Sequence, residues 1–194
     1  MLVVCRRALL LLALTMMAPL AVSCSPDGPA LDAATPSAAG SPSATERTRL
    51  GKVKEACVLL PAETVTKVLG SSKGTVLESK EGPVDDSHGQ PEYTCIYYGR
   101  GAAEALSFKV LVSPGQGGNA NAIIENIAKA ARVKTESVAG LGEAAVTYVA
   151  GNGIRALATS LSYQTQLRTL IFTAPAVVPK AKLIELARLV LVQV

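Results

Sequence analysis

The sequence predicts an α+β protein in which helices flank an antiparallel β-sheet, with the element order α-βββ-α-βββ-α. Three observations support this prediction: amphipathic helical spacing in two segments, regular strand alternation in a third, and strands grouped into two runs separated by a helix. Strands that follow one another in runs, with helices between the runs, favour an antiparallel sheet covered by helices. The approximate twofold repetition concerns the order of elements and not residue identity.

The first run of elements begins with a short helix. Residues 61–70 carry proline in the first turn and glycine at the C-terminal end, the usual places of these residues in a helix. Strands are predicted at residues 75–79, 93–98 and 105–113. The last of them alternates as a strand with one buried face does, with Leu106, Phe108, Val110 and Val112 on one side and Ser107, Lys109 and Leu111 on the other.

The second run follows a helix that we expect to extend from the N-cap residue Asn119 to Ala131. Strands are predicted at residues 143–149, 153–162 and 163–173, and the last two would form a hairpin with its turn near residues 161–164. A final helix starts at Pro179 and runs toward the end of the chain. Its apolar residues form a broad stripe, made of Leu183, Ile184, Ala187, Val190 and Leu191.

Residues 1–23 have the composition of a lipoprotein signal peptide. Arg6 and Arg7 form a positive n-region, and residues 8–22 are uncharged and mostly apolar, a stretch of 15 residues that is shorter than the roughly 17 needed to span a membrane. Residues 20–24, Leu-Ala-Val-Ser-Cys, resemble the bacterial lipobox. The sequence therefore predicts cleavage before Cys24, lipidation of its thiol, and a lipid anchor on the extracytoplasmic face of the cell membrane. Cleavage by the general signal peptidase stays an alternative, because Ala-Val-Ser at 21–23 also fits its small-x-small rule.

Residues 24–50 are predicted to be the lipidated cysteine followed by a flexible linker. Residues 25–45 include four prolines, two glycines, six alanines, four serines and two threonines. Such a composition cannot bury enough apolar surface to offset the entropy lost on ordering. Residues 51–194 are then predicted to form a single α+β domain.

The cysteines point to one disulfide. Of the four, Cys5 leaves with the signal and Cys24 carries the lipid, so Cys57 and Cys95 remain as an even pair in an oxidising compartment. Two unpaired buried thiols are the alternative. A metal site is not expected, since no histidine or third cysteine lies nearby in the sequence.

The net charge does not indicate a particular class of partner. Removing Arg6 and Arg7 with the signal lowers the formal net charge from +4 to +2, with 17 basic and 15 acidic residues. This is an ordinary balance for a soluble domain. Together with export, it argues against nucleic acid as a partner, and no motif in the sequence calls for a cofactor.

Four short motifs stand out in the predicted domain: Cys57-Val58-Leu59-Leu60-Pro61-Ala62-Glu63, Leu69-Gly70, Tyr93-Thr94-Cys95-Ile96-Tyr97 and residues 138–145. Together they resemble a family of small actinobacterial lipoproteins, of the mycobacterial and streptomycete type, that is catalogued as a domain of unknown function. The resemblance covers most of the chain from Cys57 onward and implies a disulfide between Cys57 and Cys95. This chain has Tyr97 where an aromatic residue, often tryptophan, follows the second cysteine in the family. The family supplies no known reaction and therefore no catalytic residues.

Candidate sites for chemistry are few. The only histidine, His88, lies in the polar loop 85–91, and adjacent loop residues rarely converge as a nucleophile and its base do. The glycine-rich residues 114–119 lack both the Walker lysine and a full dinucleotide fingerprint. Tyr93, Cys95 and Tyr97 share one face of a strand, so the tyrosines form either an aromatic wall for an apolar or sugar ligand or packing over a disulfide.

The sequence thus favours a non-catalytic envelope lipoprotein that binds a small apolar ligand or an envelope protein. Tyr93, Tyr97 and Phe108 are the candidate ligand-facing residues. An apolar cavity lined by Phe108, Tyr97 or Ile127 would favour the ligand, whereas a sealed core with an exposed apolar patch would favour the protein. An envelope hydrolase that uses His88 and a purely structural or antigenic surface protein are the alternatives.

Overall fold

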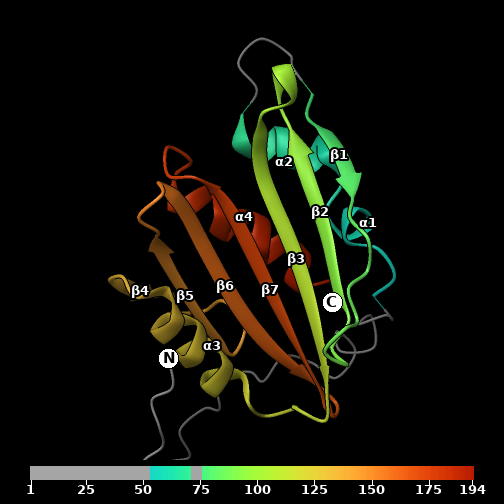
Figure 1. The fold of residues 1–194 in the computed structure, drawn as a ribbon, viewed down its shortest axis with the longest axis vertical. Coiled ribbons are helices and arrows are strands. Elements are labelled where there is room, and N and C mark those ends of the chain that lie inside the picture. Colours follow the sequence, from blue (N-terminus) through green and yellow to red (C-terminus); the bar gives the residue numbers. More distant parts are fainter. Residues whose placement is uncertain (1–52, 71–75) are drawn as a thin grey trace, which may run out of the picture. The chain divides into compact units, whose positions relative to one another are not determined.

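The computed structural model describes residues 53–70 and 76–194, which all belong to one compact unit of the chain. Within them, one seven-stranded antiparallel sheet has the strand order β1-β2-β3-β7-β6-β5-β4 (Figure 1). The α+β class and the antiparallel sheet are therefore confirmed. The predicted order of elements is only partly right, since a short helix and a short strand were missed.

Two short helices precede the sheet. α1 (Ala56–Leu59) was not predicted, and α2 (Ala62–Leu69) matches the helix predicted at 61–70. Pro61 takes the N-cap position of α2, and Gly70 ends it with a φ of 80°, a left-handed conformation that glycine adopts without strain. The buried side of α2 is formed by Ala62, Val65 and Val68.

Three strands follow: β1 (Glu78–Glu81), β2 (Glu92–Tyr98) and β3 (Glu104–Pro114), with a single 3-10 turn at Arg100–Ala102 between the last two. β2 and β3 lie within one residue of their predicted bounds. β1 begins three residues later than predicted, and Thr75, where we expected it to start, lies outside the described residues. On the side of β3 predicted to face the core, Leu106, Phe108 and Val110 are fully buried and Val112 is partly buried. On the other side, Lys109 and Leu111 are partly exposed, but Ser107 is also buried.

The second run contains α3 (Ala120–Ala131), β4 (Thr135–Ser137), β5 (Ala144–Val149), β6 (Ile154–Tyr163), β7 (Gln166–Pro175) and α4 (Lys180–Leu191). β4, an edge strand of three residues, was not predicted. The hairpin β6–β7 exists, but its turn lies at Gln164 and Thr165 and β7 starts three residues later than predicted. Gln164 adopts a φ of 54°, and because it is not glycine, a left-handed turn at this position could not be predicted from its residue type.

The helices cover the two faces of the sheet unequally. α1 packs on β1, β2 and β3, and α4 packs on β6, β7 and α2, which together enclose the main apolar core. On the opposite face, α3 packs on β5 and β6 around a smaller cluster of Ile124, Val146 and Ala158. Figure 1 shows α3 in front of one half of the sheet, with α1, α2 and α4 behind it. No described helix lies in front of β1, β2 and β3.

Candidate functional site

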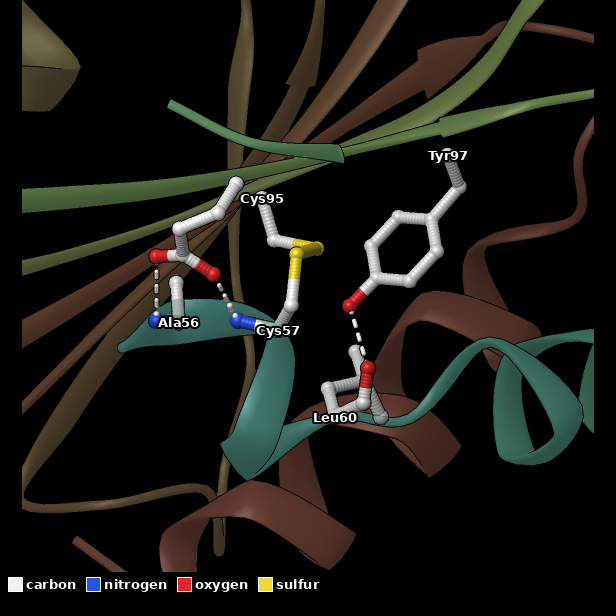
Figure 2. Close-up of a disulfide and its surroundings, with 6 residues drawn as sticks. Ala56, Cys57, Leu60, Cys95 and Tyr97 are labelled. Carbon is white, nitrogen blue, oxygen red and sulfur yellow. Dashed lines mark hydrogen bonds between the residues drawn. A yellow bond between two sulfur atoms is a disulfide. The ribbon is translucent and has the colours of Figure 1, made fainter. Parts of the chain in front are cut away.

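The two cysteines that the sequence leaves for a disulfide are joined in the structure. Cys57 of α1 and Cys95 of β2 have their sulfur atoms 1.99 Å apart and their Cα atoms 5.0 Å apart, across a separation of 38 residues (Figure 2). Cys95 is fully buried in the main core, and Cys57 is partly buried beside it. The disulfide therefore ties the first helix of the described chain to the middle of β2.

A carboxylate completes this attachment. Both oxygens of Glu81, on β1, accept backbone N–H groups of α1, one from Ala56 and one from Cys57, each at 2.7 Å. These donors belong to the first turn of a helix and have no partner within it. The carboxylate also lies close to both sulfur atoms. The two sulfur atoms are bonded to each other, and both carboxylate oxygens accept N–H groups. Cys57, Glu81 and Cys95 therefore have a structural role, in which they hold α1 on the sheet.

Tyr97 and Phe108, two of the three candidate ligand-facing residues, are fully buried. The Tyr97 hydroxyl donates a hydrogen bond to the backbone oxygen of Leu60 (Figure 2), and burial, together with the charge of Glu81, raises the pKa of Tyr97. The ring of Phe108 stacks on Phe172 of β7 with 4.7 Å between ring centroids. Both side chains are used in packing between the sheet and the helices, which supports the packing interpretation of the aromatic group.

Tyr93, the third candidate, is partly buried and packs against the same core. The two described surface hollows lie elsewhere, and none of the three aromatic candidates lines either of them. One hollow, of about 420 Å³, lies beside β1 and the turn after β2 and is lined by Val76, Glu78, Lys80, Tyr98, Gly99, Arg100, Gly101 and Ala102. The other, of about 430 Å³, lies beside β4 and β5 and includes Lys134, Glu136, Tyr148 and Arg155.

The loop that holds His88 is exposed. The Ser87 hydroxyl and His88 Nδ1 lie 2.9 Å apart, and the Ser87 backbone N–H donates to Asp85 at 3.0 Å. Hydrogen bonding of the Asp85 carboxylate to the side chain and the backbone of Ser87 holds the pKa of Asp85 below its usual value. The hydrogen bonds of the Asp85, Ser87 and His88 side chains join neighbours in sequence, while the Asp85 backbone pairs with Glu92. The described hollows do not include this loop.

The glycine-rich segment 114–119 is shaped by a close backbone approach. A Cβ atom on Gly117 would lie 2.7 Å from the backbone oxygen of Gln164, in the β6–β7 turn. The Gly118 backbone N–H donates to the Ser162 hydroxyl at 2.8 Å. The close approach to Gln164 explains the glycine at position 117, and the φ of 86° at position 118 favours glycine there.

The most distinctive surface is the side of β1, β2 and β3 that no described helix covers, which we call the open face. It is formed by Glu78, Lys80, Thr94, Ile96, Tyr98, Ser107, Lys109 and Leu111, which the strand pairing places side by side. Ile96, Tyr98 and Leu111 are only partly buried there, and Lys109 forms an ion pair with Glu92. The hollow beside Tyr98 lies at one end of this face.

The open face is not among the candidate binding sites predicted from the sequence. The pattern of β3 did contain the signal, because Ser107, Lys109 and Leu111 were predicted to point away from the core. What the pattern could not contain is the position of α3, which covers β5 and β6 and leaves β1 to β3 uncovered. An alternating strand fixes which residues share a face and not what lies against that face.

The predicted signal peptide, the predicted lipidation site Cys24 and the predicted linker lie outside the described residues. Within the described ranges, no helix has both the length and the apolar character to cross a bilayer. The likeness to small actinobacterial lipoproteins rests on the short motifs alone. No family model, no curated protein and no solved structure matches this chain.

Proposed function

We propose that this chain is an exported lipoprotein of the cell envelope, anchored through Cys24, which binds an envelope protein on the open face and has no catalytic role. The observation that carries the binding proposal is the unequal covering of β2 and β3. One side of these strands is closed by helices, and the other side presents aliphatic, aromatic and paired charged groups without a described cover.

Between a small apolar ligand and a protein partner, burial favours the protein. Tyr97 and Phe108 were the residues whose cavity would have supported a ligand, and both are fully buried in a packed core. The open face has the mixed character of a non-obligate protein interface, in which an aromatic residue and aliphatic side chains lie among polar groups. Its aliphatic members Ile96 and Leu111 are therefore the residues whose change should affect binding most.

Export and lipidation at Cys24 are supported by the signal and lipobox composition of residues 1–24. The full chain expressed in an actinobacterial host is expected to appear in the membrane fraction with the mass of a diacylglyceryl group added to Cys24. The variant Cys24→Ala is expected to lose that mass and to leave the membrane fraction. Retention of the unmodified variant in the membrane would contradict anchoring through Cys24.

Binding at the open face is tested by affinity capture of the full chain from solubilised membranes. The double variant Ile96→Asp, Leu111→Asp should lose at least one protein that the unchanged chain retains, because two buried aliphatic contacts would each be replaced by a desolvated charge. The matched control is Arg188→Asp, a charge-altering change on the exposed side of α4. Equal capture by the double variant and the control would contradict the proposal.

A further inference from the structure

Arg168 is the one charged side chain of the described residues that is buried in the core region. It lies on β7, opposite Val112 of β3 and Leu161 of β6. Because side chains alternate along a strand, it projects to the same side as Leu170 and Phe172, toward the main core. Only 3% of its surface is exposed.

The guanidinium of Arg168 lacks the partners that such burial requires. Its Nε and Nη1 have no hydrogen-bond partner, and no carboxylate of the described residues forms an ion pair with it. Its one specific neighbour is Tyr163, whose ring centroid lies 4.8 Å from Cζ. Burial lowers the pKa of Arg168, yet a guanidinium stays protonated in proteins. A buried cation that cannot discharge and has no anion nearby is strongly unfavourable.

Arg155 is an arginine with a structural role in this fold and serves as a comparison for Arg168. Its Nε donates to the backbone oxygen of Val178 at 3.0 Å, and its Nη2 donates to that of Ala176 at 3.2 Å. It thereby holds the segment that leads from β7 into α4. Arg168 makes no comparable hydrogen bond to the described backbone. A structural role like that of Arg155 therefore does not explain why Arg168 is buried.

We propose that Arg168 binds the anionic group of a ligand, a carboxylate or a phosphate, at the turn end of the β6–β7 hairpin. The charge-assisted bonds from a guanidinium suit the planar or tetrahedral oxygens of these groups. The ring of Tyr163 lies against the guanidinium. The pairing of Tyr163 with Gln166 puts the Gln166 side chain on the same face, where its amide supplies a second hydrogen-bonding group.

The residues around Arg168 are less buried than those farther along β7. Val112, Leu161, Tyr163 and Gln166 are its neighbours on that face, and all four are partly exposed, in contrast to the fully buried Leu170 and Phe172 farther along β7. An anion would therefore approach from the hairpin turn. This site lies on the opposite side of the sheet from the open face, so it does not depend on the proposed partner binding.

The proposal is tested by thermal unfolding of the full chain in detergent, with chloride replaced by acetate or by phosphate at constant ionic strength. We expect a saturable rise in Tm, of about 5 °C at ten times the dissociation constant. The rise should be absent in Arg168→Met and smaller in Arg168→Lys, which keeps the charge but lacks the fork of donors. Arg188→Gln, which removes an exposed arginine from α4, should respond as the unchanged chain does.

The two anions separate the sources of the ligand group. A response to acetate alone supports a carboxylate ligand, a response to phosphate alone supports a phosphate ligand such as a lipid headgroup, and a response to both supports a general oxyanion site. Equal behaviour of the unchanged chain and Arg168→Met in both anions would overturn the proposal.

Discussion

The two sides of β2 and β3 differ in almost every respect. On the covered side, Cys95, Tyr97, Leu106 and Phe108 are fully buried, and a disulfide and a tyrosine hydrogen bond connect them to the chain around α1. On the open face, the neighbouring residues of the same strands are mostly half-buried and include the ion pair between Lys109 and Glu92. We therefore expect the covered side to contribute most of the stability of these strands. Substitutions on the open face should leave the fold intact.

The largest loss of stability is expected from Phe108→Ala on the covered side. The ring is fully buried and stacked on Phe172, so its removal leaves a cavity and should lower the free energy of unfolding by about 4 to 5 kcal/mol. Denaturant unfolding measures the change. Leu111→Ala, on the open face of the same strand, is the control and should cost no more than about 1 kcal/mol, since its side chain already contacts solvent. Equal losses would remove the distinction between the two sides.

Removal of the disulfide is expected to follow closely. The double variant Cys57→Ser, Cys95→Ser releases a loop of 38 residues and should lower the free energy of unfolding by up to about 4 kcal/mol. Unfolding with and without a reducing agent measures the same quantity in the unchanged chain. If the reducing agent lowers the free energy of unfolding of the unchanged chain no more than that of the variant, the disulfide between α1 and β2 has no effect on stability.

A smaller loss is expected from Tyr97→Phe. The change deletes the hydroxyl that donates to Leu60 and leaves a buried backbone oxygen without a donor, at about 2 kcal/mol. The variant should also change the response to alkali. The unfolded chain loses a tyrosine proton near pH 10, whereas burial keeps it on Tyr97 in the folded chain, so the unchanged chain loses stability as pH rises above about 10. A stability–pH curve for Tyr97→Phe that falls just as steeply would contradict this account.

The smallest loss on the covered side is expected from Glu81→Gln. The amide keeps one acceptor oxygen for the N–H groups of Ala56 and Cys57 but loses the charge and the second acceptor, for about 1 kcal/mol. Hydrogen exchange of the two amides should show the change most clearly, because both would exchange faster. Unaltered exchange would mean that α1 is held by the disulfide alone.

The sequence predicted the parts of this fold that local patterns determine. Pro61 and Gly70 enclose α2, and the alternation from Leu106 to Val112 placed β3 and its buried side correctly. α1 was missed because the group that caps it, Glu81, comes from a strand 24 residues beyond Cys57. β4 was missed because a polar strand of three residues is defined only by its pairing with β5.

The candidate site was predicted less well for the same reason. The cysteine pairing followed from counting, but Tyr97 and Phe108 could not be identified as core residues before the helices were placed against them. The sequence does contain a signal for Arg168. This arginine alternates along β7 with Leu170, Phe172 and Ala174, so it occupies a position on the buried side of the strand. The open face required knowing where α3 lies, which depends on packing across the whole sheet.

The central claim, that the open face is the binding surface, is tested most directly by photocrosslinking in the envelope of living cells. A photoreactive amino acid is placed at Ile96 on the open face or at Arg188 on the exposed side of α4, in the full, membrane-anchored chain. We expect one dominant crosslinked protein from position 96. That protein should not be crosslinked from position 188. The same crosslinked proteins from both positions, or none from position 96, would contradict it.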